Sequence, residues 1–243
     1  MLFRSATSSL FTILANGNVG IGTSSPYATL SVVGTSSIST ALRVIGNVDN
    51  TTGSTTLATM SIVSGLSSPI GVVIQGRYAY VTNSVASTLS IIDISNPSSP
   101  TVVSSPSTGS SPNMPFISGR YAYIPNLGAS TMSIMDISNP TSPVTISTVP
   151  TGGSPASVFV SGRYAYVTNN TGASISIFNV SNPYSPVLVS TFGVGTGPNI
   201  VYVSGRYAYV TNSTAGTLSI IDVSNPAVRE HRWTKTRGFK EHP

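Results

Sequence analysis

The sequence predicts an all-β fold, a β-propeller of four 43-residue blades with four strands each, preceded by a short β-rich stem. The pentapeptide Gly-Arg-Tyr-Ala-Tyr begins at Gly76, Gly119, Gly162 and Gly205, and no copy carries an insertion. Short apolar runs alternate with Ser-Gly, Thr-Asn and Ser-Asn-Pro turns, a pattern typical of strands. A repeat of this length is typical of one propeller blade. Only 7% of the 243 residues are charged, whereas 22 are Gly and 17 are Pro, which argues against a helical bundle.

The third copy illustrates how one blade is divided into strands. We expect its strands at residues 157–160, 163–168, 174–180 and 187–191. Ser161 and Gly162 form the tight turn between the first two strands, because glycine readily adopts the positive φ that such hairpins require.

The Tyr-Ala-Tyr strand of each copy carries two aromatic rings on one face. We interpret all eight of these tyrosines as core residues, and sugar stacking is the alternative role. The first tyrosine of each copy is expected to occupy an equivalent buried site. These four residues are Tyr78, Tyr121, Tyr164 and Tyr207.

The phase of the repeat leaves both ends of the propeller open. Four copies counted from residue 57 end at residue 228. Residues 57–64 supply an outer strand without its three inner strands, whereas the fourth copy ends after its third strand. Pairing of the two ends would give a closed four-bladed ring, and the alternative is an open arc of a larger propeller. Contacts between residues 59–64 and 217–223 would establish the ring.

Two polar positions recur with the same period. The Asp-Ile-Ser-Asn-Pro turn begins at Asp93, Asp136 and Asp222, and the third copy has Asn179 there. Because the Asn side chain cannot act as a proton carrier but still forms an Asx turn, we interpret this position as a turn former and not as a catalytic carboxylate. An arginine follows each hairpin glycine, at Arg77, Arg120, Arg163 and Arg206. We expect these arginines to be solvated or to cap carbonyl groups; a ring of arginines that binds an anion is the alternative.

The repeat resembles two known propeller families. Gly-Arg-Tyr-Ala-Tyr-Val, followed by Ile-Ile-Asp-Ile-Ser-Asn-Pro at residues 91–97, resembles the LVIVD repeat. Tyr-Val-Thr-Asn at residues 80–83, continuing into residues 88–93, is similar to the YVTN repeat of surface-layer proteins. The resemblance covers residues 57–228. It implies an extracellular or envelope protein and names no catalytic residue.

Residues 1–34 form a separate β-rich segment. Asn-Gly-Asn-Val-Gly-Ile-Gly-Thr-Ser-Ser-Pro at residues 16–26 resembles a motif of phage tail fibres and bacterial surface fibres, which implies a homotrimer. A Gly-rich β-turn segment is the alternative, and Ser25 in place of a third glycine excludes a dinucleotide-binding fingerprint. Residues 35–56 read as a Ser/Thr-rich linker around one strand at 41–48. We identify no signal peptide and no membrane span.

The basic character of the chain is concentrated at its end. Residues 229–243 contain both His, the single Trp and five of the 11 Lys and Arg residues. Arg229 stands where Pro186 stood one period earlier, so we interpret residues 227–243 as an out-of-frame or fusion-derived end; a basic arm is the alternative. The remaining chain has no basic stripe, which predicts that nucleic acid is not a partner.

The residue inventory argues against an enzyme. The sequence has no Cys and no His before residue 231, and Asp49 with the three turn aspartates are the only carboxylates before the tail. We therefore predict no catalytic residue, cofactor or metal site. The favoured function is a non-catalytic surface or adhesion module with a protein or glycan ligand. A lectin-like propeller is the alternative, and a hydrolase or lactonase ranks third. Ligand contacts are predicted at Tyr184, Tyr202, Asn83, Asn126, Asn169 and Asn212.

Overall fold

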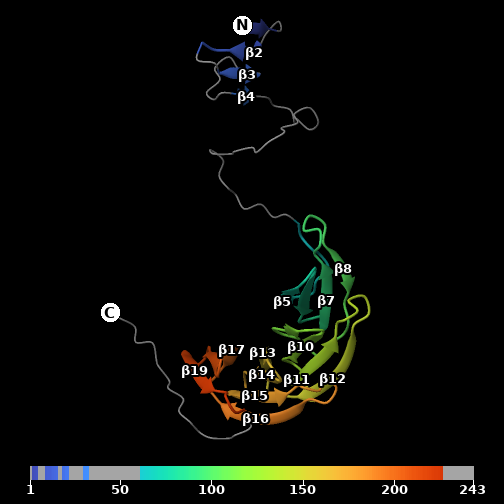
Figure 1. Ribbon diagram of the computed structural model, residues 1–243, viewed down its shortest axis with the longest axis vertical. Coiled ribbons are helices and arrows are strands. Elements are labelled where there is room, and N and C mark those ends of the chain that lie inside the picture. Colours follow the sequence, from blue (N-terminus) through green and yellow to red (C-terminus); the bar gives the residue numbers. More distant parts are fainter. Residues whose placement is uncertain (1, 5–8, 16–17, 22–29, 33–60, 227–243) are drawn as a thin grey trace, which may run out of the picture. The chain divides into compact units, whose positions relative to one another are not determined.

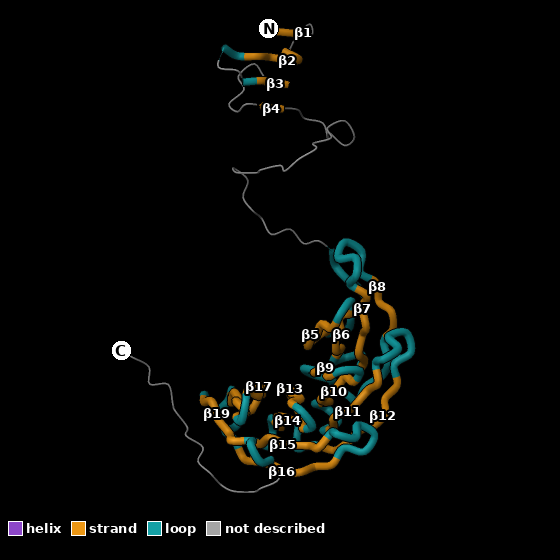
Figure 2. Tube along the Cα trace, viewed as in Figure 1, coloured by secondary structure: helices purple, strands orange, loops and turns teal. Residues whose placement is uncertain are grey.

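The computed structural model describes residues 2–4, 9–15, 18–21, 30–32 and 61–226. The chain divides into two compact units, Met1–Leu57 and Ala58–Pro243. The predicted strand at 41–48 and the basic tail lie outside the described residues, and the four-segment division of the sequence stays a prediction. Strands and loops make up the described residues, with no helix among them (Figure 2).

The first unit contains one small sheet. Its strands are β1 (Leu2–Arg4), β2 (Ser9–Ile13), β3 (Val19–Ile21) and β4 (Leu30–Val32), in this order across the sheet. Neighbouring strands are antiparallel except for β3 and β4, which are parallel. The fibre-like character of this unit, and the homotrimer that it implies, stay predictions.

The second unit contains four sheets, which we call blades 1 to 4 in chain order. Blade 1 comprises β5 (Pro69–Gln75), β6 (Tyr78–Asn83), β7 (Thr88–Asp93) and β8 (Thr101–Ser104). Blade 2 comprises β9 (Phe116–Ser118), β10 (Tyr121–Asn126), β11 (Thr131–Asp136) and β12 (Val144–Pro150). Blade 3 comprises β13 (Pro155–Ser161), β14 (Tyr164–Asn169), β15 (Ser174–Asn179) and β16 (Val187–Gly193). Blade 4 has three described strands, β17 (Pro198–Ser204), β18 (Tyr207–Asn212) and β19 (Thr217–Asp222).

The four blades follow one another along an open arc, with the first strand of each blade on the inner side and the fourth strand of blades 1 to 3 on the outer side (Figure 1). Among the described residues, β19 has no partner strand on its outer edge. The Ser61 hydroxyl instead donates a hydrogen bond to the Pro97 carbonyl in blade 1. Of the two alternatives left by the sequence, the structure has the open arc.

The hairpins confirm the predicted strand divisions to within two residues in blade 3. Ser161 pairs with Tyr164, so Gly162 and Arg163 form the two-residue loop between β13 and β14. Gly162 has a φ of +56°, at the first loop position, where type II′ turns take glycine. The three other hairpin glycines have φ between +56° and +59°.

The core lies in the layers between successive blades. Each blade presents what we call a leading face to the blade before it and a trailing face to the blade after it. Met132 and Ile134 on the trailing face of blade 2 pack with Val158 and Val160 on the leading face of blade 3. The same layers recur between blades 1 and 2 and between blades 3 and 4. Aliphatic side chains together with the second tyrosine of the repeat, Tyr80, Tyr123 or Tyr166, therefore fill the space between successive blades.

The predicted burial of the first tyrosines is wrong. Tyr78, Tyr121 and Tyr164 are only half-buried, and Tyr207 is exposed, whereas the second tyrosines of blades 1 to 3 lie in the core. The reason is position along the strand. The first tyrosine follows the hairpin loop directly, at the end of the blade, whereas the second lies in the middle of the strand between two blades.

Candidate functional site

The four predicted asparagines are interior residues. Asn83, Asn126, Asn169 and Asn212 are at most 2% exposed. The amide nitrogen of each donates to two hydroxyls of the next strand; for Asn126 these are Thr131 Oγ1 at 3.0 Å and Ser133 Oγ at 2.9 Å. The structure thus places these side chains inside the blades, where they join the second strand to the third. A ligand contact through them stays a prediction.

The two predicted tyrosines lie on different elements. Tyr184 is 57% exposed, on the turn that leads into the outer strand β16, where its backbone amide donates to Asn182 Oδ1. Tyr202 is 59% exposed and lies on the inner strand β17. The two rings therefore belong to separate surfaces.

Tyr202 is the end of a row of rings that we call the inner aromatic ladder, formed by Phe116, Phe159 and Tyr202. The ring centres of Phe116 and Phe159 are 4.7 Å apart, and those of Phe159 and Tyr202 are 4.8 Å apart with an edge-to-face geometry. The ladder follows the first strands of blades 2 to 4. Sequence reasoning missed it, although the three aromatic residues recur with the 43-residue period and Val73 holds the same place in blade 1.

The repeated arginines form a second feature. Each guanidinium lies over the ring of the tyrosine that follows it, at 5.1–5.4 Å from the ring centre, the geometry of a cation–π contact. Arg77, Arg120 and Arg206 also pair with Asp93, Asp136 and Asp222. The side chains of these three arginines are 54–61% exposed, so the predicted solvated position is confirmed, whereas their ion pairs were not predicted. The missed signal is the 16-residue spacing, because Tyr78 and Asp93 are opposite each other in the β6–β7 hairpin.

The aspartates have the structural role that the sequence predicts. The Asp93 carboxylate accepts a hydrogen bond from the backbone amide of Ser95 at 2.9 Å. In the equivalent turn of blade 3, the Asn179 side chain accepts one from the backbone amide of Ser181 at 3.0 Å. Hydrogen bonds from Arg120 and Ser138 lower the pKa of Asp136 to about 2. The Arg77 guanidinium holds the pKa of Asp93 well below its usual range.

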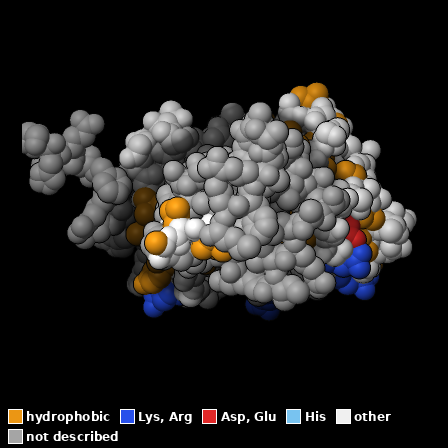
Figure 3. Space-filling view, turned by 90° about the horizontal axis from the view of Figure 1, so that it is seen from above, with side chains coloured by type: hydrophobic (Ala, Val, Ile, Leu, Met, Phe, Trp, Pro, Cys, Tyr) orange, Lys and Arg blue, Asp and Glu red, His pale blue; other side chains and the backbone are white. Residues whose placement is uncertain are grey.

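Blade 3 departs from this pattern because Asn179 replaces the aspartate. Arg163 keeps its tyrosine contact at 5.1 Å, but among the described residues it has no carboxylate partner. In the space-filling view, the blue basic side chains lie at separate points along one edge and not in one continuous patch (Figure 3). Three of the four arginines are paired with aspartates, which disfavours the anion-binding ring that the sequence left open as an alternative.

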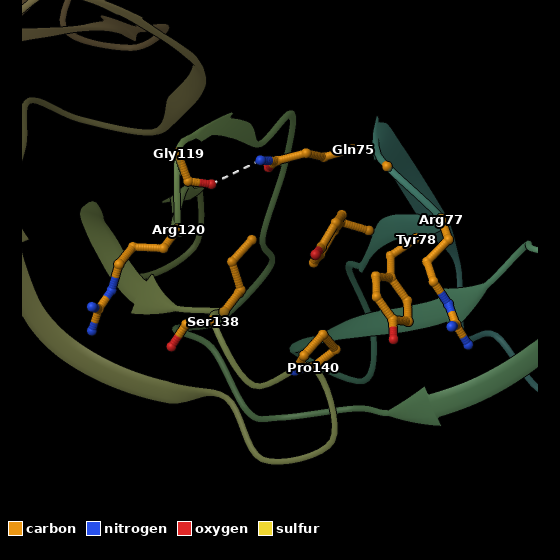
Figure 4. A pocket seen from close by; sticks show the side chains of 10 residues that line it. Gln75, Arg77, Tyr78, Gly119, Arg120, Ser138 and Pro140 are labelled. Carbon is orange, nitrogen blue, oxygen red and sulfur yellow. Dashed lines mark hydrogen bonds between the residues drawn. The ribbon is translucent and has the colours of Figure 1, made fainter.

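An open groove of about 420 Å³ lies between blades 1 and 2. We call it the Gln75 groove, because Gln75 Nε2 donates across it to the Gly119 carbonyl at 2.9 Å (Figure 4). Arg77 and Arg120 lie on its two sides in this view, with Tyr78, Ser138 and Pro140 between them. Its polar rim and ring-lined wall suit a polar ligand with an apolar face.

The repeat defines the family of the chain. The LVIVD repeat matches residues 64–108, 116–151, 152–194 and 199–228, so the chain belongs to the LVIVD repeat family. No curated protein matches the sequence. The N-terminal segment lies outside these matches.

Solved structures share the propeller fold at low sequence identity. A periplasmic gluconolactonase of Pseudomonas aeruginosa is 19% identical with a TM-score of 0.60, covering 70% of this chain and 53% of that one. A Desulfotomaculum acetoxidans protein of unknown function is 18% identical with a TM-score of 0.58, covering 64% and 55%. A Lactobacillus plantarum protein is 14% identical with a TM-score of 0.59, covering 66% and 53%. The chain spans about half the length of these proteins.

Proposed function

We propose that the chain is a non-catalytic binding module of an extracellular or cell-surface protein. The observation that supports this proposal is the structural role of the three carboxylates between residues 61 and 226, which are Asp93, Asp136 and Asp222. Each is held by an arginine and by a backbone amide of its own turn. A carboxylate whose pKa is lowered in this way is a weak proton acceptor at neutral pH, so it is poorly matched to general acid–base catalysis.

The proposed ligand is a protein or glycan surface. The Gln75 groove and the inner aromatic ladder offer side chains that contact such a ligand without chemical change. Exposed Tyr202 specifically favours a glycan, because its ring can stack on the apolar face of a sugar while its hydroxyl takes part in hydrogen bonds. A lectin-like module is therefore the second candidate function.

A glycan array separates the two candidates. If the inner aromatic ladder binds sugar, Tyr202→Ala should remove the signal, whereas Ile200→Ala, at another exposed position of β17, should keep it. Absence of any glycan signal from the parent protein would favour a protein ligand. Equal signals from all three proteins would contradict a role of the ladder in glycan binding.

The likeness to a gluconolactonase makes lactone hydrolysis the enzymatic alternative. We expect gluconolactone to hydrolyse at the same rate with and without the purified chain. Turnover above that rate, lost in Asp136→Asn, would overturn the non-catalytic proposal. Asn keeps the turn hydrogen bond at this position, as Asn179 does in blade 3, so the variant retains its fold.

A further inference from the structure

The leading face of blade 1 is exposed although the same positions form the core elsewhere. Val72 and Ile74 on β5 are 63% and 64% exposed. Their equivalents in blade 3, Val158 and Val160, are 4% and 8% exposed. The exposed apolar surface is thus one half of an inter-blade layer that lacks its other half.

The trailing face of blade 4 is the complementary half. Ile220 on β19 is 39% exposed, whereas the equivalent Ile134 and Ile177 are fully buried. Tyr202, at the end of the inner aromatic ladder, is also exposed on this side, so a second copy packed here would compete with a glycan for this ring. The two ends of the arc therefore present the two surfaces that pack together at every internal blade junction.

Residues 61–64 hold the place of an outer strand. In each internal junction, a serine of the outer strand donates to a proline carbonyl of the next blade, as Ser104 does to Pro140 at 2.6 Å. The same bond recurs from Ser147 to Pro183 and from Ser190 to Pro226. Ser61 makes this bond to Pro97 at 2.6 Å. The segment that begins at Ser61 is thus positioned as the fourth strand of a blade that would precede blade 1.

The repeat also fixes which residues this strand would pair with. In blades 2 and 3 the outer-strand serine lies opposite the central isoleucine of the third strand, and Ser190 pairs with Ile177. One period further, the equivalent partner of Ser61 is Ile220. Residues 61–64 would then lie antiparallel to residues 217–220, along the outer edge of β19 that has no strand among the described residues.

We propose that two copies of this chain associate head to tail into one ring, in which residues 61–64 of each copy complete blade 4 of the other. Strand addition to an open sheet edge supplies backbone hydrogen bonds, and the exposed end faces supply apolar burial. A second copy is the occupant because the arc superposes on about half of longer propeller chains, so its curvature is that of a larger ring. Two arcs of four blades give about eight, within the range of known propellers. Such a head-to-tail contact closes when its rotation completes the circle.

Sedimentation of the 243-residue chain tests the association. We expect twice the mass of one chain for the parent, and the mass of one chain for Val72→Arg and for Ile220→Arg. Both positions are already exposed in the single arc, so these substitutions leave each blade intact. Val85→Arg is the matched control, because Val85 is 74% exposed but lies in the β6–β7 turn, and this variant should remain a dimer.

Disulfide trapping tests the register, since the chain contains no cysteine of its own. Ser61→Cys and Ile220→Cys proteins, mixed before oxidation, should form a covalent dimer. The pair Ser61→Cys and Ser219→Cys is the control, because Ser219 is one residue out of register and its side chain points to the other face of the sheet. It should cross-link at least tenfold less.

Four results would overturn the proposal. The first is a parent protein with the mass of a single chain, and the second is a Ser61→Cys/Ile220→Cys double variant that cross-links within one chain. The third is assembly of the parent into a filament. The fourth is a trimer whose mass is unchanged by Val72→Arg. The second result would show closure of a four-bladed ring, and the last would locate association in the N-terminal unit.

Discussion

At the scale of single residues, the two tyrosines of each repeat have different tasks. Tyr166 lies in the layer between blades 3 and 4, and burial raises the pKa of its phenol. Tyr164, two residues earlier, supports the Arg163 guanidinium. The sequence places both rings on one face of the strand, but it does not reveal how far each lies from the end of the blade. This is why the burial of the second tyrosines could be predicted and the half-exposure of the first ones could not.

We predict that Tyr166→Ala lowers the free energy of unfolding by about 3–5 kcal/mol, the usual cost of truncating a buried aromatic residue. Tyr164→Ala, in the same strand, should cost less than half as much because its ring is already partly in water. Urea unfolding of the two variants measures both losses. Equal losses would contradict the division of roles between the two rings.

The lowered pKa of the turn aspartates determines how the stability of the fold should depend on pH. The pKa of Asp136 is about 2 in the folded chain, below the value of about 3.9 for an unperturbed aspartate. A group with a lowered folded pKa contributes its stability above the unfolded pKa and loses it as pH falls through the folded pKa. The melting temperature should therefore fall as pH is lowered from about 4 to about 2.

Asp136→Asn is the matched variant for this pH dependence. Asn retains the turn hydrogen bond but not the ion pair with Arg120, so the variant should melt lower than the parent at pH 7 and show a shallower decline below pH 4. Coincident curves for the two proteins would contradict the assignment. The converse change, Asn179→Asp, should raise the melting temperature at pH 7 by no more than about 3 °C, as expected for an exposed ion pair.

At the scale of strands and turns, the four blades form the same turn with different residues. The turn between the second and third strands needs a positive φ, which Ser87, Ser130 and Ala173 adopt at 54°, 54° and 42°. Blade 4 has Gly216 at this position, with a φ of +63°. Side chains other than glycine are strained in this region of φ. The first three blades therefore carry strain that the fourth avoids.

We predict that Ala173→Gly stabilises the chain by about 0.5–1 kcal/mol, because relief of this strain exceeds the added flexibility of the unfolded chain. Gly216→Ala should destabilise it by a similar amount. A Cβ at residue 216 would meet no atom within 4 Å, so the loss would come from the backbone alone. Thermal unfolding of the two reciprocal variants gives the comparison, and two changes of the same sign would refute it.

The strands themselves could be predicted because the repeat has no insertion and each hairpin is marked by glycine. The Arg–Tyr–Asp groupings could not, since Arg120 and Asp136 meet only when the register of the β10–β11 hairpin is known. The inner aromatic ladder likewise depends on neighbouring blades, because Phe159 and Tyr202 come from different sheets. Local patterns predict elements, whereas contacts between elements require the packing.

At the scale of the whole molecule, the open arc follows from the angle of rotation between successive blades. This angle is determined by the side chains packed in each inter-blade layer, and it cannot be derived from the repeat period alone. Stability in such an array is approximately a sum over blades and their interfaces. Blades 2 and 3 have a neighbouring blade on each face. Blades 1 and 4 each have one among the described residues, and blade 4 also has only three described strands where blade 1 has four. Local opening should therefore be easiest in blade 4 when the arc is a single copy.

Hydrogen exchange can measure this difference between equivalent strands of identical sequence, because Tyr-Ala-Tyr-Val-Thr-Asn forms both β14 and β18. In Val72→Arg, which we expect to be a single arc, amides of β18 should exchange at least about tenfold faster than those of β14. In the parent, where a second copy would cover the trailing face of blade 4, the two strands should differ less. Equal protection of β14 and β18 in Val72→Arg would mean that blade 4 does not depend on its missing neighbour. Since the intrinsic exchange rates of identical sequences are the same, any remaining difference reports the inter-blade interface itself.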